Sequence, residues 1–168
     1  AISVTGLFMQ PPYAEAVRQG RYRHVPISYA AFGNWLDESA IFDAIVLQVA
    51  PPDAFGNYCL GPSVEFTLQA KRKSQSVIAV VNPNVPTLAH SPCLTADDFT
   101  YLCEDDAPLT TYAIGHDAVS EAVAGNIASL IDNGAILQIG IGKLPGALLR
   151  QLKDHRDLQV WSGMVSDG

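Results

Sequence analysis

The chain has 168 residues, of which 48% are hydrophobic and 16% charged, a composition that supports a buried core and excludes a disordered or low-complexity protein. Its formal net charge of −7 argues against general binding to nucleic acid or to an anionic membrane, because both need a positive surface. No apolar run approaches the ~20 residues that a membrane span requires, and the first residues do not resemble a signal peptide.

The cysteines and histidines argue against a disulfide framework and against a metal site. The three cysteines form no C-x-x-C pair and the four histidines lie far apart, whereas zinc sites need closely spaced ligands. We therefore expect a protein of the reducing cytosol, with a cytoplasmic location and no metal. The chain lacks an initiator Met and stops shortly after a predicted strand, so we expect it to be a fragment.

The first half of the chain predicts part of a mostly parallel sheet. Residues 41–50 form a nearly continuous apolar run, which is typical of a strand buried on both faces. Ser63 can cap a helix that runs to about Lys73, with basic residues in the last turn where they complement the helix dipole. The predicted elements, in chain order, are a strand (2–9), a helix (28–36), a strand (41–50), a helix (63–73) and a strand (77–81), the last three forming a βαβ unit.

A second α/β segment follows an acidic, aperiodic connection over residues 104–116. Asp117 can cap a helix that Asn133-Gly134 ends. Its apolar residues recur with the helical period: Val119, Ala122, Val123, Ile127, Leu130 and Ile131. The elements predicted after it are a strand (135–139), a glycine-rich turn, a helix (146–155) with Pro145 in its first turn, and a strand (158–162).

Two loops lie where open parallel sheets bind ligands, beyond the carboxyl ends of strands. The turn with Gly140 and Gly142 precedes a helix, so its backbone N–H groups can face an anion, although a tight turn without a ligand has the same pattern. Gln138 stands among apolar residues and needs a hydrogen-bond partner, which is either a ligand or a neighbouring strand. The loop over residues 51–61 is either a binding loop or an ordinary connection, and Cys59 within it reads as a small buried hydrophobe.

Three blocks of the sequence, residues 51–70, 77–86 and 131–168, resemble the acetyl-CoA hydrolase/4-hydroxybutyrate CoA-transferase family of class I CoA-transferases. The resemblance extends over residues 22–168, in the family's order and spacing. It implies two similar open α/β domains with the active site between them. Residues 1–115 would be the latter part of the first domain, and residues 116–168 the beginning of the second.

The resemblance also implies a reaction in which coenzyme A moves between a short acyl-CoA and a small carboxylate. In the family a glutamate attacks the thioester, and a glutamyl-CoA thioester follows through a mixed anhydride. Gly163 occupies the place of that glutamate here, in the stretch Trp161-Ser162-Gly163-Met164. A glycine has no carboxylate, so the usual mechanism cannot run from this position.

Three explanations compete for the missing glutamate. The one we favour places the nucleophile in the first domain, upstream of Ala1, as in a subgroup with itaconate CoA-transferases among its possible relatives. The second makes the protein a non-catalytic acyl-CoA-binding member. The third gives the role to another acid of the chain: Glu15, Glu38, Glu65, Glu104 or Glu121.

The remaining site residues are carried over where they match the family's motifs. Gln138 and Gly140 correspond to a block that is implicated in oxyanion binding. The positions assigned to substrate or CoA binding are Gly61, Gly142, Lys143, Ser162, Gly163 and Met164. Lys143 is an addition to the usual motif, and it either contacts an anionic group of the substrate or is a solvated surface lysine.

The resemblance therefore predicts a CoA-transferase that uses CoA as a substrate and needs no cofactor. An acyl-CoA hydrolase is the alternative within enzymes, differing in whether water reaches the glutamyl thioester. We expect a homo-oligomer, or contacts with the remainder of the parent chain. We also expect the 168-residue chain alone to be inactive, because it lacks an evident nucleophile.

Overall fold

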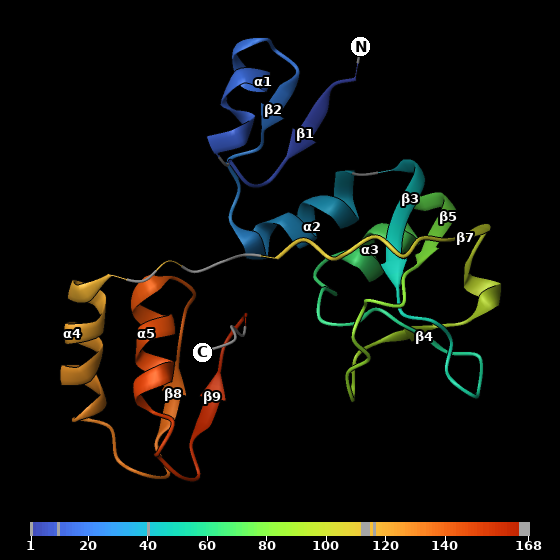
Figure 1. Ribbon diagram of the computed structural model, residues 1–168. Coiled ribbons are helices and arrows are strands. Elements are labelled where there is room, and N and C mark those ends of the chain that lie inside the picture. The colour runs from blue at the N-terminus through green and yellow to red at the C-terminus, as the bar shows by residue number, and fades with distance from the viewer. Residues whose placement is uncertain (1, 10, 40, 112–114, 116, 165–168) are drawn as a thin grey trace. The chain divides into compact units, whose positions relative to one another are not determined.

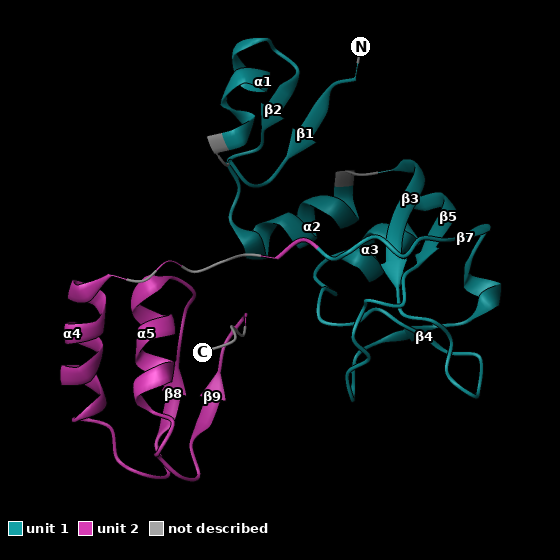
Figure 2. Ribbon diagram, viewed as in Figure 1, with its two compact units in different colours: residues 1–109 teal, residues 110–168 magenta. Residues whose placement is uncertain are grey.

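The computed structural model describes residues 2–9, 11–39, 41–111, 115 and 117–164 (Figure 1). The chain divides into two compact units, residues 1–109 and 110–168 (Figure 2). The predicted domain boundary, between residues 115 and 116, lies beside positions outside the described residues and stays a prediction. Among the described residues, no helix is long and apolar enough to cross a membrane.

Unit 1 carries a three-stranded parallel sheet in the order β3-β5-β7. Short paired strands accompany it: β1 is parallel to β2, and β4 is antiparallel to β6. The elements are β1 Val4–Gly6, η1 Pro11–Tyr13, α1 Ala14–Arg18, β2 Tyr22–His24, α2 Tyr29–Ser39, β3 Phe42–Val49, β4 Tyr58–Cys59, α3 Thr67–Arg72, β5 Ser74–Val81, β6 Cys93–Leu94, η2 Ala96–Asp98 and β7 Tyr101–Glu104. The mixed α/β class and the parallel central sheet are confirmed.

The core of unit 1 lies around β3 and β5. Leu47, Val49 and Ala79 are buried there, and Leu68 of α3 packs against the same cluster. The prediction that β3 is buried on both faces is wrong, because Val46 is 66% exposed. An apolar run does not reveal whether another element covers the second face of the strand.

The helix after the 51–61 loop starts later than predicted. Its N-cap is Phe66, without a side-chain cap, so the predicted cap at Ser63 is wrong. Glu65 has a φ of +37°, which a right-handed helix cannot contain. The basic last turn is confirmed by Lys71 and Arg72, and the Nζ of Lys71 lies 2.8 Å from Oδ1 of Asp98.

The described residues of unit 2 form two helices and a pair of parallel strands. These are α4 Ala118–Ala128, β8 Ile136–Gln138, α5 Lys143–Gln151 and β9 Gln159–Trp161. The N-cap of α4 is confirmed, because Oδ1 of Asp117 accepts a hydrogen bond from the backbone N–H of Ser120 at 2.8 Å. The predicted end at Asn133-Gly134 is wrong, since α4 ends at Ala128 with Ser129 as its C-cap. Gly134 instead lies in the turn before β8.

Helices α4 and α5 lie side by side (Figure 1). Ala124 and Ala128 are the buried residues of α4, and Gly146 and Ala147 are those of α5. Such small side chains let two helices approach closely. The apolar face predicted for α4 is therefore only partly buried, since Val119 is 73% and Leu130 83% exposed. The helical period identified an apolar face of α4. Helix α5 packs instead against the small residues Ala124 and Ala128, which lie next to that face.

Candidate functional site

The carboxyl ends of β8 and β9 bring the predicted site residues of unit 2 together. The parallel register places Gln138 opposite Trp161, and the backbone N–H of Ile139 donates to the carbonyl of Trp161 at 3.3 Å. Gly140 and Ser162 therefore follow at the ends of adjacent strands. Because ligands of parallel sheets bind at such ends, this is the candidate site, which we call the β8–β9 edge (residues 138–143 and 161–164).

Ser162 ties the two strand ends to each other. Its Oγ donates a hydrogen bond to the carbonyl of Ile139 at 2.7 Å and accepts one from the backbone N–H of Met164 at 3.2 Å. It also hydrogen-bonds the carbonyl of Met164. The segment that holds Gly163 is thus positioned against β8 by a side chain rather than by strand pairing. The end of the motif, residues 165–168, lies outside the described residues.

The turn from Gly140 to Gly142 presents backbone donors. Within the described part of the chain, the N–H groups of Gly140, Ile141 and Gly142 donate to no protein acceptor. Gly142 is the N-cap of α5 with a φ of +134°, a conformation that L side chains rarely adopt. These donors stand at the amino end of a helix, where the backbone dipoles favour an anion.

Gln138 is exposed, which corrects the argument that its amide must be satisfied in an apolar environment. Its neighbour Ile136 is 67% exposed and Ile141 50% exposed, whereas Ile139 is buried. The desolvation cost that we expected is therefore absent. The Gln138 amide makes no hydrogen bond to any residue that the structure describes, so it stays available as a donor beside the Gly140 turn.

Lys143 forms an ion pair within unit 2. Its Nζ lies 3.3 Å from Oδ2 of Asp117, and both side chains are partly exposed. The Asp117 carboxylate also caps α4. Hydrogen bonds from Ser120, first of all from its backbone N–H, hold the pKa of Asp117 below its ordinary value, with a smaller contribution from Lys143. Lys143 is therefore neither a purely solvated lysine nor a free cation.

Gly163 lies in open surroundings. A Cβ built on it would meet no heavy atom within 4 Å, and its φ is not in the left-handed region. The backbone and the described neighbours therefore accept a larger side chain at this position. Nothing in the described structure requires glycine where the resemblance places a glutamate.

The five alternative acids are divided between the two units. Glu121 is the one that belongs to unit 2, and its Oε1 pairs with Nη2 of Arg150 at 2.6 Å, joining α4 to α5. Glu15 pairs with Arg18 on α1. The remaining three are exposed residues of unit 1: Glu38, Glu65 and Glu104. The structure gives Glu15 and Glu121 structural partners and supplies no support for a nucleophile among the five.

Gly61, the predicted binding position of unit 1, is enclosed. Its φ is +67°, and a Cβ there would lie 2.7 Å from Cγ1 of Val85. Its N–H donates to Sγ of Cys59 at 3.2 Å, and its carbonyl accepts from Oγ of Ser91 at 2.7 Å. Both backbone groups are thus occupied within the protein, which accounts for the glycine by packing alone.

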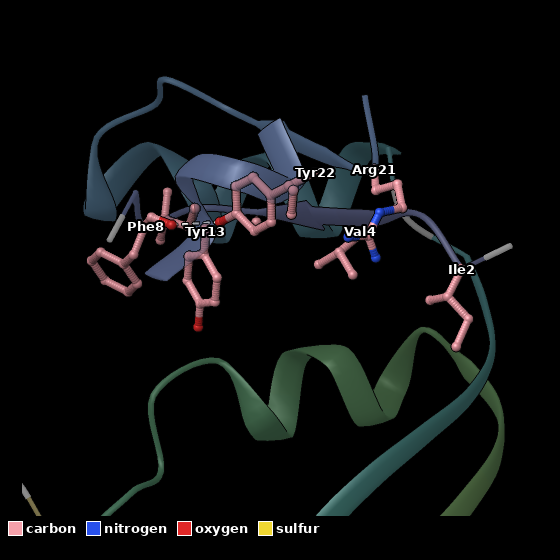
Figure 3. Close-up of a pocket in the computed structure, with 9 residues that line it drawn as sticks. Ile2, Val4, Phe8, Tyr13, Arg21 and Tyr22 are labelled. Carbon is pink, nitrogen blue, oxygen red and sulfur yellow. Dashed lines mark hydrogen bonds between the residues drawn. The ribbon is translucent and has the colours of Figure 1, made fainter. Parts of the chain in front are cut away.

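Two surface hollows lie among the described residues of unit 1. One, of about 520 Å³, lies at the carboxyl ends of β3, β5 and β7 between prolines and acids: Pro51, Pro52, Val81, Pro83, Glu104, Asp105 and Asp106. The other, of about 560 Å³, is apolar and is formed by β1, β2 and the segment between them (Figure 3). Tyr13 and Tyr22 stack there, with ring centroids 5.0 Å apart. The sequence indicated the start of the 51–61 loop, which lines the first hollow, but no pattern in it indicated the second.

The comparison with known protein families decides the family of this chain. Residues 2–112, more than half of the chain, match the model of the acetyl-CoA hydrolase/transferase N-terminal domain. The chain belongs to the acetyl-CoA hydrolase/transferase family. This confirms the resemblance that the sequence blocks carry.

Curated relatives of this acetyl-CoA hydrolase/transferase chain are CoA-transferases. The chain is 34% identical over 166 residues to 4-hydroxybutyrate coenzyme A transferase of Clostridium kluyveri, a match that covers 96% of this chain and 38% of the relative. It is 29% identical to a succinyl-CoA:acetate/propanoyl-CoA:succinate CoA transferase of Fasciola hepatica, covering 98% and 35%. The chain thus spans little more than a third of the length of these relatives.

Solved structures share the fold of this chain. A 4-hydroxybutyrate CoA-transferase from Porphyromonas gingivalis matches with a TM-score of 0.78 at 25% identity, over 99% of this chain and 44% of that one. RipA from Yersinia pestis matches with a TM-score of 0.81 at 22% identity, over 93% and 38%. The RipA match supports the fold alone.

Proposed function

We propose that this chain is part of a cytoplasmic CoA-transferase that moves coenzyme A between a short acyl-CoA and a small carboxylic acid. Membership of the acetyl-CoA hydrolase/transferase family supports the proposal, and so do relatives that are named as CoA-transferases. In this proposal CoA is a substrate, and the reaction uses no metal or prosthetic group because an enzyme carboxylate carries CoA as a thioester between the two acids.

The observation that carries the proposal is the arrangement of the β8–β9 edge. The attack of a carboxylate on a thioester develops negative charge on the carbonyl oxygen, and preorganised donors stabilise that charge. The backbone N–H groups of Gly140 and Gly142 and the exposed amide of Gln138 lie together at this edge. We assign these donors to the oxyanion, and Ser162 to positioning the adjacent segment.

Around these donors we assign the neighbouring positions to substrate or CoA binding. Gly163 and Met164 would line the same edge, and Lys143 would offer its charge to a carboxylate or phosphate once it leaves Asp117. Gly61, in the other unit, supports its own loop in this proposal. A contact with CoA would have to use groups other than its occupied N–H and carbonyl.

The nucleophilic glutamate, in this proposal, lies outside these 168 residues. Gly163 cannot attack a thioester, and Glu121 is engaged with Arg150. The isolated chain should therefore bind acyl-CoA weakly or not at all and show no transfer. We further propose that the active protein is a homo-oligomer, which light scattering on the complete gene product would test.

The decisive experiment uses the gene product that contains this chain. It is incubated with acetyl-CoA and an isotopically labelled small carboxylic acid, and labelled acyl-CoA is measured. Sodium borohydride is added during turnover to reduce a glutamyl-CoA thioester, and peptide mass spectrometry then locates the modified residue. We expect transfer, with the modified glutamate outside residues 1–168. The proposal would be overturned if the gene product transferred no CoA and no glutamate were trapped.

A non-catalytic acyl-CoA-binding protein is the second candidate, favoured by Gly163 itself. The open surroundings of that residue permit a direct test with Gly163→Glu and Gly163→Ala as its matched control. If the site lost its nucleophile at this position, Gly163→Glu should form a trappable thioester that the alanine variant lacks. If the nucleophile is elsewhere, neither variant should gain one. Free acid released without an acceptor would mark the hydrolase alternative.

A further inference from the structure

Two of the three free cysteines face each other across a short strand pair in unit 1. Cys59 of β4 and Cys93 of β6 are direct partners in the antiparallel register, although 34 positions separate them in the sequence. The third, Cys103, belongs to β7 and its thiol donates to the carbonyl of Ala79 at 3.5 Å. The β4–β6 pair thus places two thiols in register and leaves the third on another strand.

The hydrogen bonds around this pair show which kind of cross-strand position it is. The N–H of Leu60 donates to the carbonyl of Pro92 at 3.0 Å, and these two residues follow Cys59 and precede Cys93. That bond flanks a non-hydrogen-bonded pair, in which opposite Cα atoms lie about 4.5 Å apart and the side chains point to the same face. Disulfides span Cα separations of about 4.4–6.8 Å, so the backbone can accept a bond without rearrangement.

The two thiols differ in access. Cys59 is 2% exposed, whereas Cys93 is exposed. Burial alone would raise the pKa of the Cys59 thiol, but hydrogen bonds around its sulfur, which accepts the Gly61 N–H at 3.2 Å, lower it overall. Burial and the neighbouring Cys59 raise the pKa of Cys93. Because Cys93 is exposed and Cys59 is buried, an oxidant reaches Cys93 first, and Cys59 is the partner that completes the bond.

We propose that Cys59 and Cys93 are a site of reversible intramolecular disulfide formation, with a low-molecular-weight disulfide such as oxidised glutathione as the oxidant. The Cys93 thiolate attacks one sulfur of the oxidant, forming a mixed disulfide and releasing one thiolate. The Cys59 thiolate then attacks the Cys93 sulfur, forming the protein disulfide and releasing the second thiolate. Two protein thiols are oxidised and one small disulfide is reduced to two thiols, which take up the two protons.

The bond would change the surroundings of Gly61. The sulfur of Cys59 accepts the Gly61 N–H, and Ser91 beside Cys93 holds the Gly61 carbonyl. Oxidation would join the loop that follows β3 to the segment that follows β5 by a covalent bond. One of these segments holds the N–H of Gly61, and the other holds its carbonyl. The proposal depends only on the β4–β6 pairing. Its failure would therefore say nothing about the proposed CoA transfer, and the failure of CoA transfer would say nothing about it.

The test treats the full 168-residue chain, under native conditions, with a series of ratios of oxidised to reduced glutathione, followed by alkylation with iodoacetamide and peptide mapping. We expect the free thiols to fall from three to one as the ratio rises, with a peptide that links Cys59 to Cys93 and Cys103 alkylated throughout. Dithiothreitol should restore all three thiols. Retention of three thiols at the most oxidising ratio would overturn the proposal.

Two variants separate this bond from other oxidation products. Cys93→Ser changes an exposed residue and removes one partner of the link, so the buried thiol of Cys59 should stay reduced at every ratio. The matched control Cys103→Ser should form the link as the wild type does. A stable glutathione adduct on Cys93 with Cys59 still reduced would contradict the proposal, as would a bond that links two chains on a non-reducing gel.

Discussion

Gly61 and Gly163 are each the second residue after a short strand, one in each unit, and they have opposite surroundings. Gly61 follows β4, and a Cβ there would strike Val85 at 2.7 Å. Gly163 follows β9, and a Cβ there would meet nothing within 4 Å. The sequence alone does not distinguish a glycine that the fold requires from one that it does not. Packing requires glycine at position 61, whereas the described structure does not require it at position 163.

This difference bears on the missing glutamate. If packing had enforced glycine at 163, the loss of a carboxylate would follow from the fold. Because the position is open, its glycine needs an explanation from the chemistry of the protein, which is why the nucleophile is sought elsewhere. Substitutions in the two units test whether packing distinguishes Gly61 from Gly163.

The largest expected effect is that of Gly61→Ala compared with Gly163→Ala. The first forces a side chain into a positive-φ conformation and against Val85, and it should lower the free energy of unfolding by about 2–4 kcal/mol. The second should change it by less than about 0.5 kcal/mol. Urea unfolding followed by circular dichroism measures both, and equal values for the two variants would remove the distinction.

A smaller effect is expected where α4 packs on α5. Ala124 is fully buried, and Ala124→Leu should cost about 1–3 kcal/mol of unfolding free energy because the helices cannot separate freely. Ala122 is exposed on the same helix, so Ala122→Leu is the matched control and should cost little. Thermal unfolding of both variants tests the packing. If Ala124→Leu left the stability unchanged, the other face of α4 would be the buried one.

The smallest effect is the pH dependence that Asp117 confers. Its pKa is lowered in the folded chain, mainly by the hydrogen bond from Ser120, so the carboxylate stabilises α4 above its unfolded pKa. This contribution disappears as the pH falls through the lower, folded value, below about pH 4. The melting temperature of Asp117→Asn should lie below that of the wild type at pH 7, and the difference should narrow at pH 3. A difference that stays constant over this range would show that the charge is not involved.

Local signals in the sequence predicted much of the fold. The Asp117 cap, the basic end of α3, and the strand–glycine–helix order around Gly142 depend on contacts within a few residues, which a sequence displays directly. The blocks that resemble the family extended this to the gathering of Gln138, Gly140 and Ser162 at one edge. The failures at Ser63 and at the end of α4 concern boundaries, where turns compete with helices over one or two hydrogen bonds.

The α/β class, the family, the order of the longer helices and strands, and the absence of a carboxylate at 163 could be obtained from the sequence, whereas the short elements α1, β2, β4, β6 and β7 were not predicted. The burial of individual apolar residues became clear from the structure, since Val46 and Val119 are exposed while Ala124 is not. The structure alone showed that Gln138 is exposed, that Gly61 is enclosed, and that Cys59 faces Cys93. The physical reason is that periodicity describes one element at a time, whereas burial and cross-strand register depend on which distant segment lies beside it.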